Sequence, residues 1–173
     1  MRRTLLTIGH STHPIADFIS ILEAHGVDQL ADVRTIPRSR HNPQFNHDAL
    51  QAALAEAEMC YVPMPGLGGL RRAAPDSPHI SWRNASFRGY AGYMQTAAFR
   101  ENLDRLIELS SETQTVIMCA EAVPWRCHRS LIADALAVRG IPVEHIMSAT
   151  SARAHKLTPF ARITGTQIIY DAA

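Results

Sequence analysis

Apolar runs of strand length alternate along the chain with runs whose apolar residues recur at helical spacing. This alternation is typical of a parallel α/β sheet, in which each strand is followed by a crossover helix. Strands are predicted at residues 5–9, 29–33, 61–64, 115–120 and 143–147. The run at 115–120 is apolar throughout, as expected for a strand covered on both faces. We therefore expect a three-layer α/β fold, a mostly parallel open sheet of about five strands with helices on both faces.

The predicted helices lie between these strands, and small polar residues or glycine mark their ends. They cover residues 14 to 25, 48 to 58, 97 to at least 107, and about 127 to 139. Thr12 or His13 is expected to cap the first helix, and Gly26 to end it. Asn46 and Thr96 are expected to cap the second and third helices.

The chain indicates one domain. Its 173 residues are enough to bury a core, and it has no internal repeat, low-complexity tract or dividing linker. We therefore assign residues 1–173 to a single α/β domain. A C-terminal hairpin is expected around Gly165, antiparallel at the sheet edge. Residues 64–93 are rich in Gly, Pro and Arg and show no sustained period, so they are expected to form a long irregular loop.

The composition excludes several classes of protein. A hydrophobic content of 46% excludes a disordered chain, and a net charge of +1 excludes binding of nucleic acid by bulk charge alone. No apolar run approaches the roughly 20 residues of a membrane span, and the first residues turn polar too early for a signal peptide. Three cysteines do not make a disulfide framework. We expect a cytoplasmic protein with free thiols and no membrane partner, in which Cys60 belongs to the core. Nothing in the sequence indicates an oligomeric state.

Polar side chains follow three of the predicted strands. His10 and Ser11 follow the first strand, Arg34 and Arg38 follow the second, and Cys119 ends the fourth. In open α/β sheets, ligands bind beyond the carboxyl ends of the strands, where the strand order reverses. We therefore expect these residues to meet in one site. Ser11, Arg34 and Arg38 would bind the substrate there, because arginine suits bidentate binding of anions.

The most informative segment runs from Cys119, at the end of a strand, to Arg129, in the first turn of the next helix. The exposed N–H groups and the dipole at a helix start favour an anion and lower the pKa of a thiol. The preferred interpretation is a carboxylate site in which Glu121 acts as acid, base or nucleophile. His128 and His10 would carry protons, and Arg129 would bind an anionic substrate group.

The same segment supports three other interpretations. Cys119 and Arg126 share features with the loop of a cysteine phosphatase or rhodanese, although Arg126 stands one residue beyond the usual phosphatase spacing. Cys119 and Cys127 are a candidate dithiol pair without the tight Cys-x-x-Cys spacing. Together with Glu121 and His128, these cysteines have the ligand types of a zinc site. We keep Cys119 among the catalytic candidates and Cys127 among the substrate-binding candidates, and assign no metal.

The same residues can also have purely structural roles. Cys119, at the end of a buried strand, has the character of a small core residue. Arg129 is also suited to pair with Glu121 and pin the loop, and His10 to bond only to the backbone. These alternatives stay open at the level of the sequence.

The long loop carries a second group of candidates. Arg71 and Arg72 stand among aromatic residues that include Tyr90, and basic residues interleaved with aromatics can follow a nucleic-acid backbone and stack on bases. We therefore add these three residues to the substrate-binding candidates. The alternative is a loop whose aromatic rings pack on the domain.

No cofactor motif is present. Residues 66–69 are glycine-rich but lack the Gly-Lys-Ser/Thr ending of a phosphate loop. Gly9 alone does not make a dinucleotide fingerprint. We predict no cofactor.

Several of these elements, taken in order over nearly the whole chain, resemble the family called domain of unknown function 488. The motifs are Thr7-Ile8-Gly9-His10-Ser11, Asp32-Val33-Arg34, Phe45-Asn46, Leu67-Gly68-Gly69, Cys119-Ala120-Glu121, Cys127-His128-Arg129 and His155-Lys156-Leu157-Thr158-Pro159-Phe160. The resemblance implies a small cytosolic α/β domain and supports the positions of the site residues. It does not supply a reaction.

The leading hypothesis is an enzyme with hydrolytic or transfer chemistry on a nucleotide, a nucleic acid or another phosphorylated substrate, with Glu121 at its centre. Its partner would be a small anionic substrate or a nucleic acid. The first alternative is a nucleotide- or nucleic-acid-binding module without catalysis. The second is a redox or metal site built on Cys119 and Cys127.

Overall fold

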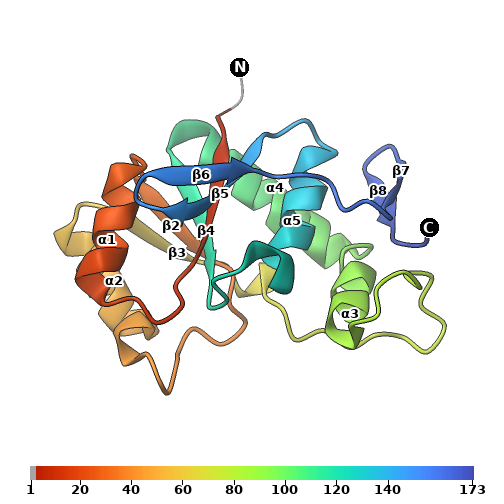
Figure 1. The fold of residues 1–173 in the computed structure, drawn as a ribbon, viewed down its shortest axis with the longest axis horizontal. Helices are drawn as coiled ribbons and strands as arrows, with labels where there is room; N and C mark the ends of the chain where they lie inside the picture. The colour runs from red at the N-terminus through yellow and green to blue at the C-terminus, as the bar shows by residue number, and fades with distance from the viewer. Residues whose placement is uncertain (1–2) are drawn as a thin grey trace.

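The computed structural model describes residues 3–173, and its centre is one sheet (Figure 1). The strands are β1 (Leu5–Gly9), β2 (Gln29–Asp32), β3 (Cys60–Pro63), β4 (Thr115–Cys119), β5 (Val143–Ser148) and β6 (Ser151–Ala154). They form a six-stranded sheet in the order β3-β2-β4-β1-β5-β6, in which β6 runs antiparallel to β5 and the other neighbours are parallel. The predicted mostly parallel α/β sheet is confirmed, and β6 is a strand that the sequence pattern did not predict.

Helices cover both faces of the sheet. They are α1 (Ile15–Ala24), α2 (His47–Glu56), α3 (Ala85–Tyr93), α4 (Ala97–Glu112) and α5 (Arg129–Ala137). Phe18 and Leu22 of α1 pack with Leu50 of α2 in the core on one face, and Leu103 of α4 and Leu131 of α5 belong to the core on the other. Figure 1 shows the two groups of helices on opposite sides of the strands. None of the helices in the described part of the chain is long and apolar enough to cross a membrane.

The connections leave the two central strands in opposite directions. From β1 the chain passes through α1 to β2, on the far side of β4, and from β4 it passes through α5 to β5, on the far side of β1. Such a reversal opens a crevice at the carboxyl ends of the two strands. The N–H groups of His10 and Ser11 donate to the carbonyl oxygens of Cys119 and Ala120, each at 2.9 Å, and so hold the two strand ends together.

Two predicted helix caps differ in the structure. Pro14 occupies the N-cap position of α1, which has no side-chain cap, so the expected cap by Thr12 or His13 is wrong. Pro14 has the φ that its ring fixes, −56°, but an extended ψ of 145°, so the helix begins at the next residue, Ile15. Asn46 does stand at the N-cap of α2, but its Oδ1 accepts a hydrogen bond from the Ser39 N–H at 2.7 Å and caps no helix N–H.

The expected irregular stretch at 64–93 contains the helix α3. Asn84 caps it, with Oδ1 accepting hydrogen bonds from the N–H groups of residues 86 and 87 at 2.8 and 3.3 Å. Gly89 and Gly92 lie within the helix and disfavour it locally, which hides it from the hydrophobic pattern. Gly89 is needed there because a Cβ atom would overlap the carbonyl group of Arg71.

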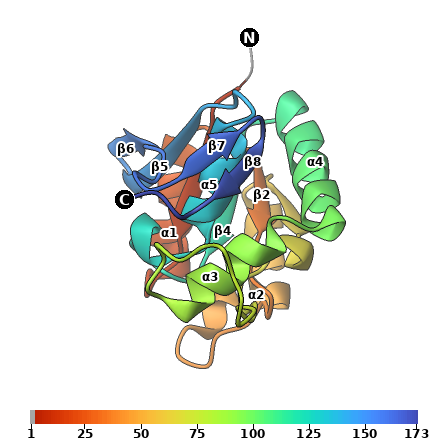
Figure 2. The same cartoon turned by 90° about the vertical axis from the view of Figure 1, so that its right-hand side faces the viewer.

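The predicted C-terminal hairpin is confirmed, but its expected place is wrong. The strands β7 (Arg162–Thr164) and β8 (Gln167–Ile169) pair with each other as a separate two-stranded sheet, while β6 occupies the edge of the main sheet. Figure 2 shows the hairpin lying over α5. The hydroxyl of Tyr170, which follows β8, donates to Asp134 Oδ2 of α5 at 2.8 Å and ties the hairpin down.

The three cysteines are free thiols with different surroundings. Cys119 and Cys127 are buried, whereas Cys60 is exposed, so its predicted place in the core is wrong. Cys60 is the first residue of β3, which is an edge strand of the main sheet and pairs with β2 on one side only.

Candidate functional site

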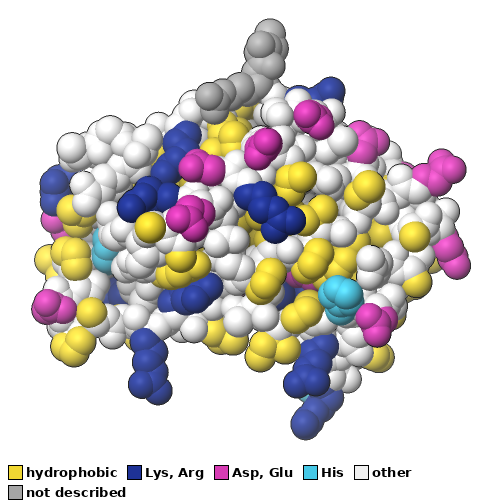
Figure 3. Space-filling model, turned by 180° about the vertical axis from the view of Figure 1, so that it is seen from behind, with side chains coloured by type: hydrophobic (Ala, Val, Ile, Leu, Met, Phe, Trp, Pro, Cys, Tyr) yellow, Lys and Arg dark blue, Asp and Glu magenta, His cyan; other side chains and the backbone are white. Residues whose placement is uncertain are grey.

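A cavity of about 340 Å³ opens at the carboxyl ends of β2 and β4, beside the point where the strand connections diverge. Its walls come from the end of β2, the segment before α3, α3 itself and the loop from β4 to α5. The lining residues are Arg34, Thr35, Ile36, Arg38, Gly69, Leu70, Ser86, Phe87, Tyr90, Cys119, Ala120, Glu121, Arg126, Cys127 and His128. The carboxyl ends of the strands lie at the lower edge in Figure 3, and Lys or Arg side chains protrude from that edge.

Arg129 is fully buried beneath this cavity, and its donors are bound to protein groups. Its Nη1 lies 2.7 Å from Cys119 Sγ and also donates to the carbonyl oxygen of Glu121. Its Nη2 donates to the carbonyl oxygen of Ala122 at 3.0 Å, and its Nε to Thr7 Oγ1 at 3.2 Å. The guanidinium therefore supports the Cys119 sulfur and the loop behind it, and it does not line the cavity.

The two buried thiols, Cys119 and Cys127, differ in their pKa values because their surroundings differ. Burial by itself raises the pKa of Cys119, but a hydrogen bond from Cys127 and the positive charge of Arg129 lower it to about 7. Burial raises the pKa of Cys127 well above its usual value, and the hydrogen bond to Cys119 raises it further. As the pH rises through about 7, the pair therefore loses one proton, from Cys119, while Cys127 stays protonated.

His128 is held as a neutral imidazole beside Cys127. Because a carbonyl oxygen only accepts, Nε2 must carry the proton that it shares with Val33 O at 2.9 Å. This leaves the unprotonated Nδ1 3.5 Å from Cys127 Sγ. Burial lowers the pKa of His128 to about 4. Gly69 packs on the ring, where a Cβ atom would lie 3.2 Å from Nδ1.

The Glu121 carboxylate points away from this arrangement. The residue is exposed, and its Oε1 accepts a hydrogen bond from the Val123 N–H at 3.4 Å. Its backbone carbonyl, rather than its carboxylate, meets Arg129 and accepts a weak bond from the Cys119 thiol at 3.6 Å. The loop can approach this closely because Gly9 has no Cβ atom, which would overlap the same carbonyl oxygen.

A second buried cluster stands at the end of β2. Arg34 donates to both oxygens of Asp32, from Nε at 2.9 Å and from Nη2 at 2.7 Å, and the Tyr61 hydroxyl donates to Asp32 Oδ2 at 2.6 Å. Arg34 also donates to the carbonyl oxygen of Phe45 at 2.7 Å, and its Nη1 lies 3.5 Å from His10 Nε2. Asp32 thus orients Arg34, whose remaining surface lines the cavity.

His10 serves this cluster rather than the cavity. Its Nδ1 donates to the carbonyl oxygen of Ser11 at 2.8 Å, and its ring stacks on Phe45 with centroids 4.2 Å apart. Burial lowers its pKa, so it is neutral at physiological pH. The structure brings His10 to the strand ends, as expected, but not to the cavity wall.

Of the other residues predicted to bind the substrate, some line the cavity and some do not. Arg38 is exposed and lines the cavity, and so does Arg126, which was considered only in the phosphatase-like interpretation. Arg72 is exposed and lies outside the cavity lining. Ser11 lies outside it as well, and adopts a left-handed conformation with φ of 49° while its N–H holds the end of β4.

The aromatic rings of residues 64–93 pack on the domain. Tyr90 is buried in the cavity wall, and its hydroxyl donates to the carbonyl oxygen of Leu67 at 2.7 Å. Arg71 covers the ring of Tyr93, with its guanidinium carbon 3.7 Å from the centroid. Trp82 is enclosed by neighbouring aromatic rings. These rings are therefore not free to stack on successive bases.

The cavity lining also includes residues that were not predicted from the sequence, although they stand next to basic residues in the chain. Ile36 and Leu70 are 51% and 78% exposed, and they flank the mouth as apolar residues next to the basic positions 34, 38 and 71. Thr35 directly follows Arg34, and its hydroxyl donates to Gly69 O at 2.8 Å, which closes the cavity between β2 and the segment before α3.

No group of three or more His, Cys, Asp or Glu side chains in residues 3–173 comes together in a way that could hold a metal ion. The zinc interpretation of Cys119, Glu121, Cys127 and His128 has no support in this geometry. The reason is that the Glu121 carboxylate turns outward and His128 Nε2 is bound to a backbone carbonyl.

A comparison with protein families gives one match. Residues 14–136, which include the whole cavity lining, match the family described as "Domain of unknown function DUF488". No curated protein and no solved structure matches the chain. The match covers well over half of the chain, and the protein belongs to this family.

Proposed function

We propose that this member of the DUF488 family is an enzyme that transfers or hydrolyses a group of a small anionic substrate, with Cys119 as its nucleophile. The observation that carries the proposal is the fully buried Arg129 guanidinium held 2.7 Å from Cys119 Sγ, while Cys119 itself lines a cavity. A cation fixed beside a sulfur stabilises the thiolate, which is the nucleophilic form of cysteine.

The arrangement favours Cys119 over Glu121 as the reacting group. Glu121 is exposed, and a single long hydrogen bond, from the Val123 N–H at 3.4 Å, orients its carboxylate. Cys119, in contrast, has a lowered pKa with two identified causes, the Cys127 thiol and Arg129. Glu121 is better placed to influence which substrates enter, because its negative charge stands at the cavity rim.

The reaction would proceed in two displacements. The Cys119 sulfur forms a bond to the electrophilic atom, and the leaving group departs with its electron pair and takes a proton from Cys127 or from water. Water or an acceptor group then displaces the sulfur and restores the thiolate. His128 Nδ1, which lies 3.5 Å from Cys127 Sγ, can accept a hydrogen bond from the Cys127 thiol and so orient it.

The cavity mouth supports an anionic substrate, of which a nucleotide or another phosphorylated compound is the class we expect. Arg34, Arg38 and Arg126 line the cavity, and Glu121 is its single acidic lining residue. The volume of about 340 Å³ lies at the lower end of the usual range for small-molecule sites, roughly 300 to 1,000 Å³. Ile36 and Phe87 provide apolar surface for the rest of the molecule.

A second candidate, dithiol–disulfide exchange, is favoured because Cys119 and Cys127 are both free, buried thiols that line the same cavity and shift each other's pKa in opposite directions. Cys119 would attack a substrate disulfide and release one substrate thiol. Cys127 would then displace the second thiol and leave a Cys119–Cys127 disulfide. Two electrons would pass to the substrate, and a thiol reductant would have to restore the pair.

The first experiment measures the reactivity of Cys119. The folded Cys60→Ser variant, which removes the exposed thiol, is treated with iodoacetamide over a range of pH, and the modified residue is identified by mass spectrometry. We expect Cys119 to react with a midpoint near pH 7, because that is where its pKa lies. Protection of Cys119 from the reagent, or a midpoint at the ordinary value of about 8.5, would contradict the proposal.

A second experiment separates the candidate reactions. The protein is tested on phosphate monoesters, nucleotides, anionic thioesters and a small anionic disulfide. Cys119→Ser should abolish turnover, and Glu121→Gln should leave most of it, whereas loss of activity in Glu121→Gln alone would restore the carboxylate hypothesis. Cys127→Ser should abolish disulfide exchange but only slow the transfer reaction. Cys60→Ser is the matched control and should behave as the unaltered protein.

A further inference from the structure

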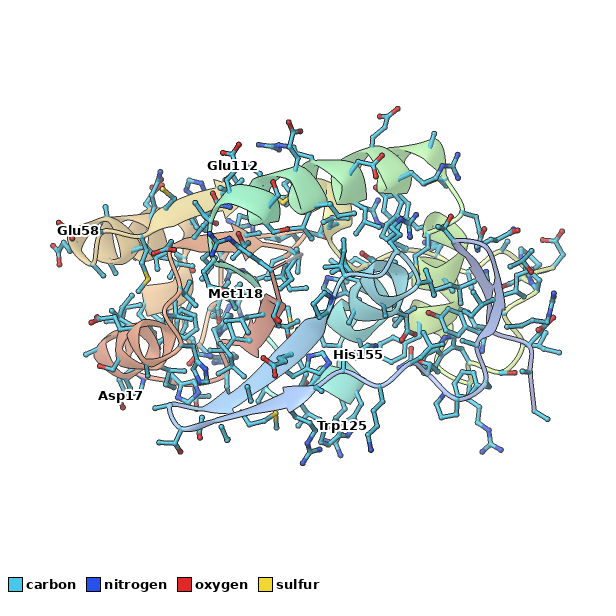
Figure 4. The ribbon with its side chains drawn as sticks, turned by 90° about the horizontal axis from the view of Figure 1, so that it is seen from above. Asp17, Glu58, Glu112, Met118, Trp125 and His155 are labelled. Carbon is cyan, nitrogen blue, oxygen red and sulfur yellow. The ribbon has the colours of Figure 1, made fainter. Side chains whose placement is uncertain are left out.

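A second cavity, of about 360 Å³, lies on the other side of the segment that carries Cys127. It is bounded by the turn before α5, by the chain that leaves β6 and by the aromatic cluster over α5. Figure 4 shows Trp125 and His155 close together in this region, beside α5. The two cavities share none of their lining residues.

The charge in this second cavity is of one sign. Arg153 and Lys156 line it, and none of its lining residues is acidic. Within residues 3–173, neither of these two cations has a carboxylate oxygen within ion-pair distance. Lys156 is also the only lysine of the chain. Two unpaired cations at one cavity attract an anionic group and have no internal competitor for it.

Aromatic side chains provide the other walls. Both tryptophans of the chain line the cavity, and Phe160 lies beside Trp82 with ring centroids 4.8 Å apart. Trp125 is 57% exposed, and the Arg153 guanidinium carbon lies 5.9 Å from its ring centroid. An exposed indole beside a cation presents a flat face on which a planar ring can stack.

The floor of the cavity is preformed by a chain of hydrogen bonds. The Thr7 hydroxyl meets His145 Nδ1 at 2.6 Å, His145 Nε2 meets His155 Nδ1 at 2.9 Å, and His155 Nε2 meets Asp134 Oδ1 at 2.8 Å. With Thr7 donating, each imidazole accepts at Nδ1 and donates from Nε2, so both rings are satisfied as neutral groups. Asp134 is fixed in turn by Thr158, whose hydroxyl donates to Oδ2 at 2.7 Å. The two histidines that line the cavity are thus held in place before any ligand enters.

We propose that this second cavity binds a small aromatic anion, with the size and chemistry of a nucleoside monophosphate. Trp125 would stack on the aromatic ring, and Arg153 and Lys156 would bind the anionic group. The volume is sufficient for one such molecule. The proposal does not depend on the reaction at Cys119, because the two sites have separate walls.

The position of both tryptophans gives a direct assay. Tryptophan fluorescence of the full chain is followed during titration with adenosine monophosphate, with excitation where the nucleotide does not absorb, and calorimetry provides an independent affinity. Saturable quenching is expected because the chain has no tryptophan outside this cavity. Adenosine and inorganic phosphate should each bind at least about 10-fold more weakly, since each lacks one of the two recognised groups.

Variants then locate the binding site. The double change Arg153→Gln and Lys156→Gln should weaken binding by about 10-fold or more. Arg105→Gln, which removes one exposed charge from α4, is the control and should leave the affinity unchanged. Cys119→Ser should bind as the unaltered protein does, which keeps this test separate from that of the proposed reaction. Absence of saturable quenching would overturn the proposal. So would equal affinity for adenosine, or unaltered binding by the double variant.

Discussion

The buried His145 makes the stability of the fold sensitive to acid. Burial, together with the nearby His155 and Arg129, lowers its pKa to about 3, although Asp134 opposes them. An unfolded histidine has a pKa of about 6.5. Below that pH the unfolded chain binds a proton that the folded protein excludes, so stability is fully present above pH 6.5 and is lost as the pH falls toward 3.

The size of the effect follows from the lowered pKa. One pH unit is worth about 1.4 kcal/mol for one proton, so His145 alone costs about 2 kcal/mol on going from pH 7.5 to pH 5. His128, whose pKa is lowered to about 4, costs nearly the same. Together they remove about 4 kcal/mol, a large part of the 5 to 15 kcal/mol that stabilises a typical domain.

The assay is urea unfolding at several pH values between about 7.5 and 5. His145→Gln keeps a group that can accept from Thr7 and donate to His155, and it cannot take up the proton. We expect this variant to be less stable at pH 7.5 and to lose about 2 kcal/mol less than the unaltered protein on acidification. His41→Gln, at an exposed position, is the control and should follow the unaltered profile. If His145→Gln kept the full pH dependence, the reasoning would be refuted.

Three further predictions concern particular contacts. Gly9→Ala should lower the free energy of unfolding by about 1 to 3 kcal/mol, since its Cβ atom would overlap a carbonyl oxygen of the loop after β4. Gly92→Ala, where a Cβ atom meets nothing within 4 Å, is the control for this change and should be neutral or stabilising when both variants are compared in thermal melts. Thr96→Ala should cost about 1 kcal/mol in urea unfolding, because Thr96 Oγ1 accepts an N–H of the first turn of α4 at 3.2 Å. Arg129→Lys should raise the pH midpoint of Cys119 alkylation by about 1 unit, and an unchanged midpoint would show that the guanidinium does not control this thiol.

The repetitive elements are the part of the fold that local pattern predicts well. The strand β4 was predicted one residue longer than it is, and the helix after Thr96 was predicted with its correct cap. These elements are predictable because their apolar residues follow a single period and their ends carry recognisable caps.

The pattern fails where an element depends on a distant partner. The strand β6 is exposed along its length and exists through its pairing with β5, so it has no alternation of its own. The helix α3 contains two glycines and is held to the domain by Tyr90, which is buried in the core and whose hydroxyl donates to the carbonyl oxygen of Leu67. Cys60 was placed in the core by composition, although it stands on an edge strand.

The sequence alone predicted that polar residues following three strands would lie at one edge of the sheet, because parallel strands bring their carboxyl ends together there. Cys119, Cys127 and His128 do line one cavity there. Only the tertiary structure decided which atoms face that cavity. Arg129 turns inward because Thr7 of β1 and two loop carbonyls bind its guanidinium, and this leaves Glu121 to point its carboxylate to solvent. Side-chain direction within a loop is set by partners far away in the chain, which residue spacing does not encode.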